Sequence, residues 1–146
     1  MKPTKRKKLK PIGRLIKEAS SLAQLWARLD RADKYGNCKC VTCGIAGHYK
    51  TMQGGHFIER GKAATRLFHE NIHPQCPGCN LYGMKKASTV LAYRRYLVGL
   101  YGDPFITALE LTARQTKKWN RQQLEDYITI KKLLCKNKRD WIESVI

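Results

Sequence analysis

The sequence predicts an α+β fold in which a small, turn-rich core is flanked by N-terminal and C-terminal helices. Apolar residues recur at helical spacing in residues 14–34 and again after residue 88. Between these segments, residues 37–79 hold few helix signals and many glycines. The chain has 146 residues, which suits one domain with arms and permits only a small hydrophobic core.

We divide the chain into three parts. Residues 1–12 form a basic arm that is too charged to pack and is interrupted by two prolines. Residues 13–102 form the central domain, and residues 103–146 form a helical extension. The central domain begins with a helix over residues 14–34, because the following apolar residues share one face: Leu15, Ala19, Leu22, Trp26 and Leu29.

The centre of the chain is predicted to contain two strands and a short helix. The strands cover residues 51–58 and 67–72 and are joined by a basic loop. The helix starts near Pro77 or Cys79 and runs to about Lys86, since proline suits the first helical turn.

Three further helical segments are predicted after this core. The first follows Ser88, which we assign as its N-cap, and ends at Gly102. Asp103 and Pro104 open a second helix through Leu111. The last helix covers residues 121–136.

The charge of the chain predicts a polyanionic partner. Its 29 lysines and arginines against 11 acidic residues give a net charge of +18, which favours nucleic acid or an anionic membrane surface. No apolar stretch approaches the roughly 18 residues of a membrane span, and no apolar segment follows the basic N-terminus as in a signal peptide. We therefore expect no membrane insertion and a cytoplasmic, reducing location.

Two C-x-x-C pairs, 32 residues apart, predict a structural zinc site. In a reducing compartment such pairs are metal ligands or redox sites rather than disulfides. A redox pair needs a βαβ context and does not explain two pairs. Of the other cysteines, Cys38 is a poorer candidate ligand and Cys135 is expected to be a small buried residue. The predicted zinc ligands are Cys40, Cys43, Cys76 and Cys79.

A histidine and an asparagine stand beside this zinc motif. His56 follows Gly54 and Gly55, which we expect to admit a phosphate backbone because they carry no side chain. A neutral imidazole can take a proton from water. Asn80 directly follows the last zinc ligand, and an amide oxygen suits Mg²⁺. A lone strand histidine is more often a structural residue, and the nearby asparagine is what favours a catalytic role.

The block from Cys40 to Asn80 resembles HNH, or His-Me finger, endonucleases. The carrying motifs are C-V-T-C, G-G-H-F and E-N-I-H-P-Q-C-P-G-C-N. More narrowly, residues from Leu15 to Gly102 resemble the phage lambda NinG (Rap) family of recombination nucleases. The resemblance implies a zinc-stapled ββα-metal core that cuts branched DNA, such as Holliday junctions and D-loops. It also implies the cytoplasm of a bacterial host if the chain is phage-encoded.

The resemblance also implies roles for single residues. His56 matches the general base, Asn80 the Mg²⁺ or Mn²⁺ ligand, and Asn71 the asparagine that orients the loop or the base. His73 matches the N-I-H histidine, whose role stays open between supporting the site, binding metal and contacting DNA. Cutting two opposed strands would favour a homodimer. Basic residues around this core are candidate DNA contacts: Arg60, Lys62, Arg66, Lys85, Lys86, Arg94 and Arg95.

One position departs from the pattern of many HNH enzymes. They carry Asp directly before the base histidine, where this chain has Gly55. The arrangement Q-G-G-H resembles the D-R-G-H of related nucleases, with Gln53 in the place of the acid. The catalytic metal is then held by Asn80 and water, with His73, Glu59 or Glu70 as candidate helpers.

Two other functions fit the same composition. A non-catalytic zinc-finger protein that binds DNA or junctions needs only the four cysteines and the basic surface. An RNA-binding, ribosome-associated zinc protein fits the charge but does not call for the G-G-H and C-N motifs. A metal-dependent endonuclease for branched DNA, with catalytic residues His56, Asn71, Asn80 and His73, accounts for more of the sequence.

Overall fold

The computed structural model describes residues 1–2 and 4–144, so Pro3 of the predicted arm and the last two residues of the predicted extension lie outside the described residues. The chain order of helices and strands is α1 (Ile12–Asp30), β1 (Asn37–Lys39), β2 (Ala46–His48), β3 (Gln53–His56), η1 (His69–Asn71), β4 (Ile72–Gln75), η2 (Gly78–Tyr82), η3 (Gly83–Lys85), α2 (Ala87–Tyr101), α3 (Asp103–Thr112) and α4 (Arg121–Glu143). The predicted α+β class is confirmed.

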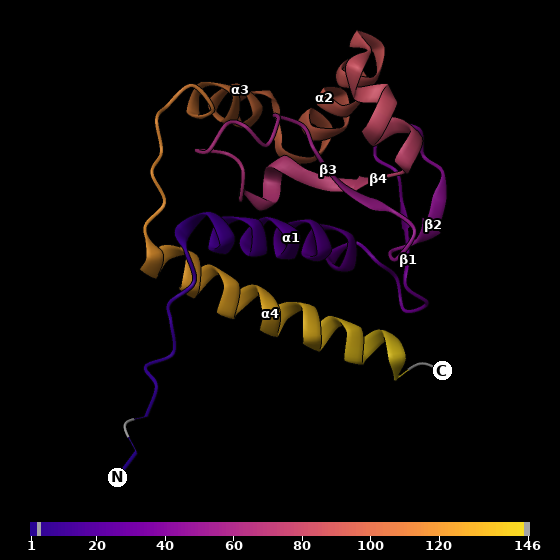
Figure 1. The fold of residues 1–146 in the computed structure, drawn as a ribbon. Coiled ribbons are helices and arrows are strands. Elements are labelled where there is room, and N and C mark those ends of the chain that lie inside the picture. The colour runs from indigo at the N-terminus through magenta and orange to yellow at the C-terminus, as the bar shows by residue number, and fades with distance from the viewer. Residues whose placement is uncertain (3, 145–146) are drawn as a thin grey trace.

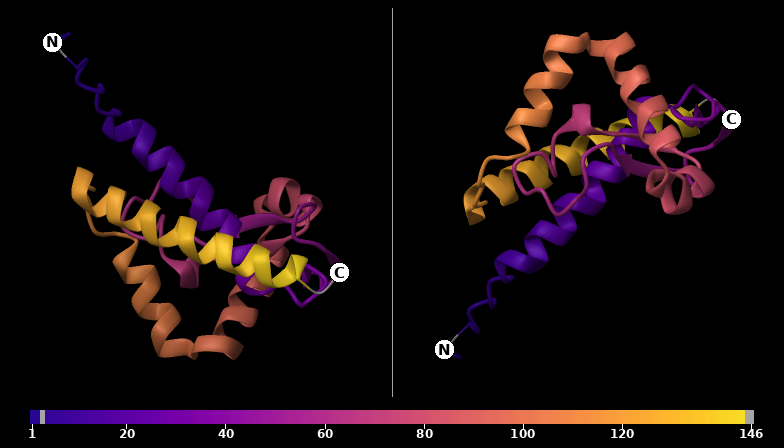
Figure 2. Two further views of the ribbon diagram at one scale, coloured as in Figure 1. Left: turned by 90° about the horizontal axis from the view of Figure 1, so that it is seen from below. Right: turned by 90° about the horizontal axis from the view of Figure 1, so that it is seen from above.

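These elements form layers around α1 (Figure 1). The β3–β4 ribbon packs on one side of α1, and α4 packs along its other side. The helices α2 and α3 lie beyond the ribbon, and the basic arm leads away from the start of α1 (Figures 1 and 2). The helix α1 is therefore the central layer, with the ribbon held against it.

The predicted apolar face of α1 faces the core, with Leu15, Ala19 and Leu29 buried and with Leu22 and Trp26 partly buried. Ala23 and Ala27, which were not predicted, are also buried. Leu15, Ala19, Ala23 and Ala27 of α1 are buried together with Ile72 of β4. The extension adds Leu124 and Ile128 from α4 to the same cluster, so it shares the core of the central domain.

The helix ends differ from the predicted ones for local reasons. The helix α1 ends at Asp30, not at residue 34, because the Asp33 carboxylate accepts hydrogen bonds from the backbone N–H groups of Tyr35 and Asn37. Ser88 lies inside α2, which begins at Ala87, while the predicted stop at Gly102 is confirmed by its φ of 88°.

The last helix starts where it was predicted but is longer. Asn120 caps α4, accepting from the backbone N–H of Gln123, whose side chain binds back to the backbone of Asn120. The helix continues to Glu143, beyond the predicted end at residue 136.

The two short sheets are antiparallel ribbons. Strand β3 lies within the predicted residues 51–58, but the second predicted strand was wrong. Residues 67–71 instead turn through η1, and β4 runs from Ile72 to Gln75. Pro74 is tolerated in β4 because the ribbon has only two strands and needs no bond from its missing N–H. The β1–β2 hairpin was not predicted at all.

The helix predicted to start near Pro77 or Cys79 and to run to about Lys86 is two irregular segments. A π-helical turn, η2, is followed by a 3-10 turn, η3. The cysteine pair at its start accounts for the irregularity. The sulfur of Cys76 accepts from the backbone N–H of Cys79, and the carbonyl of Cys76 accepts from the backbone N–H of Asn80. None of the helices in the described residues is long and apolar enough to cross a membrane.

Candidate metal centre and active site

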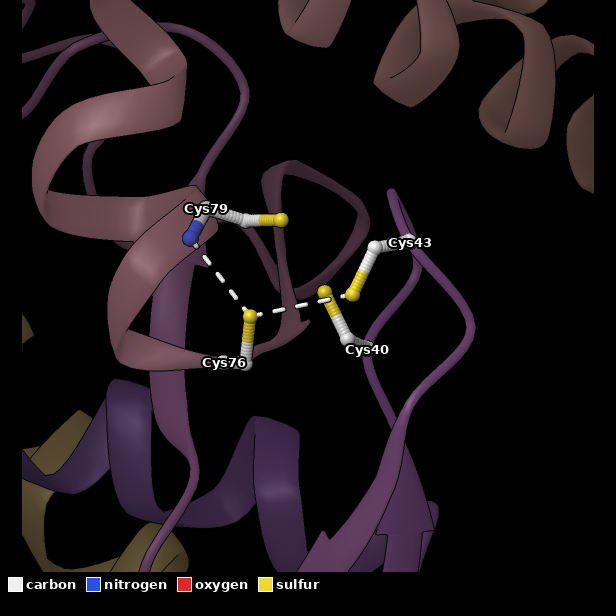
Figure 3. Close-up of side chains that lie close together, drawn as sticks. All are labelled: Cys40, Cys43, Cys76 and Cys79. Atoms are coloured by element: carbon white, nitrogen blue, oxygen red, sulfur yellow. Dashed lines mark hydrogen bonds between the residues drawn. The ribbon is translucent and has the colours of Figure 1, made fainter.

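The four predicted zinc ligands meet at one point (Figure 3). The sulfur atoms of Cys40, Cys43, Cys76 and Cys79 all lie within 4.8 Å of one another, and Cys43 and Cys76 are 3.7 Å apart. Four sulfur atoms each about 2.3 Å from a tetrahedral zinc ion are about 3.8 Å from one another. The cluster therefore has the size of a Cys₄ zinc site and could hold a structural zinc ion.

Two chain turns present these sulfur atoms. The first pair follows β1, where Gly44, with a φ of 79°, donates its N–H to the carbonyl of Cys40 at 2.8 Å. The second pair follows β4, where the N–H of Cys79 points to the sulfur of Cys76 at 3.5 Å. The N–H of Val41 binds the carbonyl of Pro74 at 2.9 Å, which joins the two turns.

The remaining two cysteines take no part in the cluster. Cys38 and Cys135 are 4% and 0% exposed and pack in an apolar cluster with Leu29 and Met52. The expected burial of Cys135 is confirmed.

His56 and Asn80 line one open cavity of about 570 Å³ beside β3. Two residues of α1, Gln24 and Arg28, form part of its wall. The rest of the wall comes from β3, from the loop that follows it and from the helical segments after the zinc cluster: Gln53, Gly54, Glu59, Arg60, Leu81 and Met84. The structure thus brings together two predicted site residues that are far apart in the sequence.

The hydrogen bond of His56 defines its tautomer. Its Nε2 lies 2.9 Å from the carbonyl oxygen of Arg66. A carbonyl can only accept, so Nε2 carries the hydrogen and Nδ1 keeps a free lone pair. Burial, together with the charges of Arg60 and Arg66, lowers the pKa of His56 to about 4. The imidazole is therefore neutral near pH 7, as a proton acceptor must be.

The side chain of Asn80 is held by Gln53, which stands where the D-R-G-H motif of related nucleases has its aspartate. Its side-chain N–H donates to the Gln53 side-chain oxygen at 2.7 Å. Among the described residues, its own amide oxygen has no hydrogen-bond partner. Of the three predicted helpers, Glu59 lines the cavity, whereas Glu70 and His73 are not among its lining residues. The oxygen atoms of Asn80 and Glu59 are of the type that binds Mg²⁺ or Mn²⁺.

Asn71 fastens the loop between β3 and β4. It is fully buried, and its amide oxygen accepts from the N–H of Ile58 at 2.8 Å. Its amide nitrogen donates to the carbonyls of Ile58 and Thr65. Both ends of the loop that carries Arg60 and Lys62 are therefore fixed by one side chain.

The packing around β3 requires glycine at the two positions before His56, a reason that the sequence did not indicate. A Cβ at Gly54 would lie 2.6 Å from the Cα of Gln24 in α1, and a Cβ at Gly55 would lie 1.8 Å from the Gln75 side-chain oxygen. Protein atoms thus occupy the space that a side chain would need at both glycines, and Gly54 lines the open cavity of His56. A side chain at position 55 would require the buried Gln75 side chain to move.

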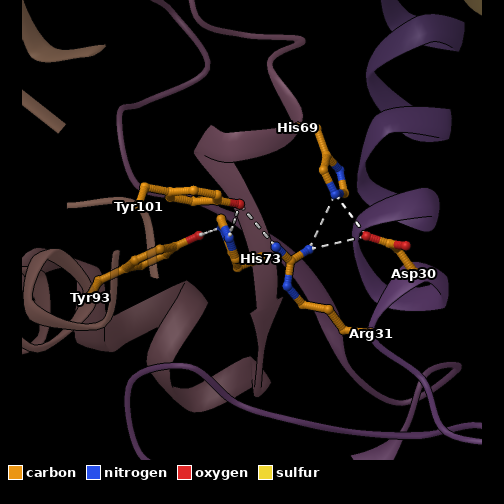
Figure 4. A network of polar contacts seen from close by, with 6 residues as sticks. All are labelled: Asp30, Arg31, His69, His73, Tyr93 and Tyr101. Atoms are coloured by element: carbon orange, nitrogen blue, oxygen red, sulfur yellow. Dashed lines mark hydrogen bonds and ion pairs between the residues drawn. The ribbon is translucent and has the colours of Figure 1, made fainter. Parts of the chain in front are cut away.

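His73 lies away from the cavity in a set of tyrosines (Figure 4). The Tyr93 hydroxyl donates to the carbonyl of Gly55 at 2.7 Å, so its oxygen accepts from His73 Nδ1 at 3.3 Å. Then Nε2 of His73 must accept from the Tyr101 hydroxyl at 3.3 Å, and that oxygen accepts from Arg31 at 3.1 Å. This chain of hydrogen bonds ends on the carbonyl of Gly55, the residue before His56. His73 therefore helps to hold strand β3 in place.

The surroundings of His73 keep it neutral. Its ring is fully buried on β4 and meets the rings of Tyr93, Tyr96 and Tyr101 edge-on. Burial lowers the pKa of His73 to about 2, helped by the charge of Arg31 and by His69. Asp30 partners Arg31 at 3.8 Å. A second proton on His73 would leave Tyr101 facing two donors.

The predicted DNA contacts lie at three places in the structure. Arg60, Lys62 and Arg66 lie on the loop between β3 and β4, and Arg60 lines the cavity of His56. Lys85 and Lys86 are exposed before α2. Arg94 and Arg95 lie on α2 and line another depression. Arg94 is paired with Asp103 at 3.2 Å and with Glu110 at 2.9 Å, so two carboxylates balance its charge.

Residues of α1 were missing from the predicted site. Gln24 and Arg28 line the cavity of His56. Arg28 is also held by the carbonyls of Gln24, Tyr49 and Met52. The only signal in the sequence was the polar face of this helix, opposite its apolar stripe.

The comparisons with known proteins give one match. A family model described as "Bacteriophage Lambda NinG protein" matches residues 2–141 of the chain. Neither the curated proteins nor the solved structures contain a match.

We predict that the purified protein carries one zinc ion per chain and loses its fold with it. Structural zinc binding contributes about 10 kcal/mol or more, comparable to the whole stability of a domain. Cys76→Ser should abolish zinc binding and unfold the chain, measured by elemental analysis and circular dichroism. Cys135→Ala is the control and should keep its zinc. A folded, zinc-free Cys76→Ser protein would contradict the structural role.

We predict that His73 makes the fold sensitive to acid. The pKa of His73 is lower in the folded chain than the ordinary 6.5. Its contribution to the free energy of unfolding is therefore fully present above pH 6.5 and is lost as the pH falls below 6.5. From about pH 7.5 to about pH 5.5 it should remove about 1.4 kcal/mol of unfolding free energy.

Urea denaturation at both pH values measures this loss. In His73→Gln, which keeps a neutral hydrogen-bonding side chain, the pH dependence should shrink by that amount. An unchanged pH dependence in the variant would show that His73 is not the titrating group.

Proposed function

Because the chain belongs to the phage lambda NinG family, we propose that it is a metal-dependent endonuclease that cuts branched DNA during recombination. The family supports a recombination-related role. The observation that supports endonuclease activity is that His56 and Asn80 line the same cavity next to the zinc cluster. A proton acceptor and a metal-binding oxygen in one basic cavity are what phosphodiester hydrolysis needs.

The local topology supports an HNH-like core. Strands β3 and β4 are antiparallel, and the helical segments η2 and η3 follow them. His56 ends the first strand, and Asn80 lies near the start of the helical part. This order of strand, strand and helix is the one expected of a ββα-metal core, with the zinc cluster fixing the point where the helical part begins.

In this reaction His56 acts as the general base. Its Nδ1 takes a proton from a water molecule in line with the scissile phosphate, while Nε2 stays bonded to the carbonyl of Arg66. The oxygen of that water forms the new bond to phosphorus as the bond to the 3′ oxygen breaks. The leaving oxygen takes a proton from solvent, which gives 5′-phosphate and 3′-hydroxyl ends.

Asn80 and Glu59 are the residues that would hold Mg²⁺ or Mn²⁺ in the cavity. A bound ion of this kind supplies positive charge to the phosphate and the leaving oxygen. Gln53 keeps the Asn80 amide oriented, and Arg60 brings its guanidinium to the same cavity, where it can bind a phosphate oxygen.

The proposed substrate is branched double-stranded DNA, including Holliday junctions and D-loops. The charge of +18 supports binding through the phosphate backbone. Two opposed cuts at a junction would come from a homodimer that presents two such cavities.

The alternative is a zinc protein that binds junctions without cutting them. The Cys₄ cluster and the basic surface alone would suffice for it. It gives no reason for a neutral histidine and an oriented asparagine in the same cavity, so the endonuclease is favoured.

We predict Mg²⁺-dependent nicking of a synthetic four-way junction that EDTA abolishes. His56→Ala should lower the rate by about a hundredfold or more, because a general base contributes at least that much. Asn80→Ala should also lose metal-dependent cutting. Both variants should keep their zinc and bind the junction, as measured by elemental analysis and by fluorescence anisotropy in Mg²⁺-free buffer without chelator.

His48→Gln is the matched control, since it changes a histidine of the β1–β2 hairpin. It should cut at the wild-type rate. Full activity in His56→Ala would sink the assignment of the base, and binding without any cutting by the wild type would favour the junction-binding alternative.

A further inference from the structure

A second open cavity, of about 520 Å³, adjoins the cavity of His56. The two share Gln24 and Arg60 as lining residues. One wall of the second cavity is α1 and the other is the loop between β3 and β4, and its lining residues are Lys17, Ser20, Ser21, Gln24, Arg60, Gly61 and Arg66. The two cavities form one groove between this helix and this loop, which we call the α1 groove.

One polar face of α1 runs along the whole groove. Lys17, Ser21, Gln24 and Arg28 follow one another three or four residues apart, so they lie on the same side of the helix. From Lys17 to Arg28 the helix rises about 16 Å. The groove is thus longer than one phosphodiester group, and the His56 cavity occupies only part of it.

The charges in the second cavity favour an anion. Lys17, Arg60 and Arg66 are among its lining residues, and no carboxylate lines it. A different cavity, between the basic arm and α4, also has lysines but includes Glu18 and Glu125. The second cavity therefore differs from a merely basic surface in having no opposing charge.

Arg66 is held in place for such a role. Its Nε donates to the hydroxyl of Ser20 at 2.8 Å, and Ser20 is only 4% exposed. This bond fixes the plane of the guanidinium and leaves its two terminal nitrogens for a ligand. The carbonyl of the same residue binds His56 at 2.9 Å. An anion bound by Arg66 would thus be positioned relative to the base.

We propose that the second cavity binds a backbone phosphate of the DNA strand, next to the phosphate in the His56 cavity. Lys17 and Arg60 contact it from the rim and Arg66 from the floor. The contact carries no base information, because these groups recognise phosphate and not base edges. Which phosphate is cut rests on the proposed function, but the binding itself does not.

Salt dependence of DNA binding tests this proposal. The probe is a fluorescent four-way junction in Mg²⁺-free buffer without chelator, titrated with full-length, zinc-loaded protein between about 50 and 200 mM salt. Lys17→Gln and Arg60→Gln, both exposed positions, should each weaken binding several-fold and reduce the slope of log K against log salt by about one. The losses should be the same for junctions of unrelated sequence.

Arg139→Gln is the control, because it removes an equal charge from an exposed position on α4. It should leave the slope unchanged. Wild-type slopes in both Lys17→Gln and Arg60→Gln, or losses as large in Arg139→Gln, would overturn the α1 groove as the phosphate site. Losses that depend on the sequence of the junction would also overturn it.

The nicking assay keeps this proposal separate from the proposed function. If the wild type binds the junction but never cuts it, the proposed endonuclease activity is wrong. The salt slopes of the variants then still test whether the α1 groove binds phosphate. If the wild type cuts and Lys17→Gln, which changes a residue of the second cavity alone, binds and cuts as the wild type does, the groove fails while the endonuclease stands.

Discussion

The meeting of four cysteine sulfur atoms is the constraint on which the site depends. The cluster joins the turn after β1 to the end of β4, and η2 starts from it. Asn80 follows the last ligand directly, so the position of its amide beside Gln53 is set by the cluster. A chain with a net charge of +18 and a small core has little other means of holding an irregular helical segment against a two-stranded ribbon.

The helix α1 provides the second constraint. Its apolar face is buried against β4 and α4, and its backbone comes so close to Gly54 that no side chain fits there. Its polar face then lines the cavity of His56 and the cavity beside it. One helix thus packs the core, sets the position of the strand that carries the base, and forms a wall of the groove proposed for DNA.

Local chemistry decided what the sequence could predict. The cysteine spacing and the helical periodicity around Leu15 and after Ser88 are properties of short segments, and both led to the right elements. The three-residue strands β1 and β2 are too short to show a period. The surroundings of His73 depend on Tyr93 and Tyr101, which reach it only through the fold. The reason for Gly54 likewise lies in Gln24, thirty positions earlier.

The most direct measurement of the account is a crystal structure grown with zinc and soaked in Mn²⁺, with each metal located by its anomalous scattering. Zinc should lie among the sulfur atoms of Cys40, Cys43, Cys76 and Cys79, and Mn²⁺ should lie on the amide oxygen of Asn80 in the cavity that His56 lines. Zinc at the four sulfur atoms with no Mn²⁺ in that cavity would contradict the proposed catalytic site, and no metal at the cysteines would contradict the account as a whole.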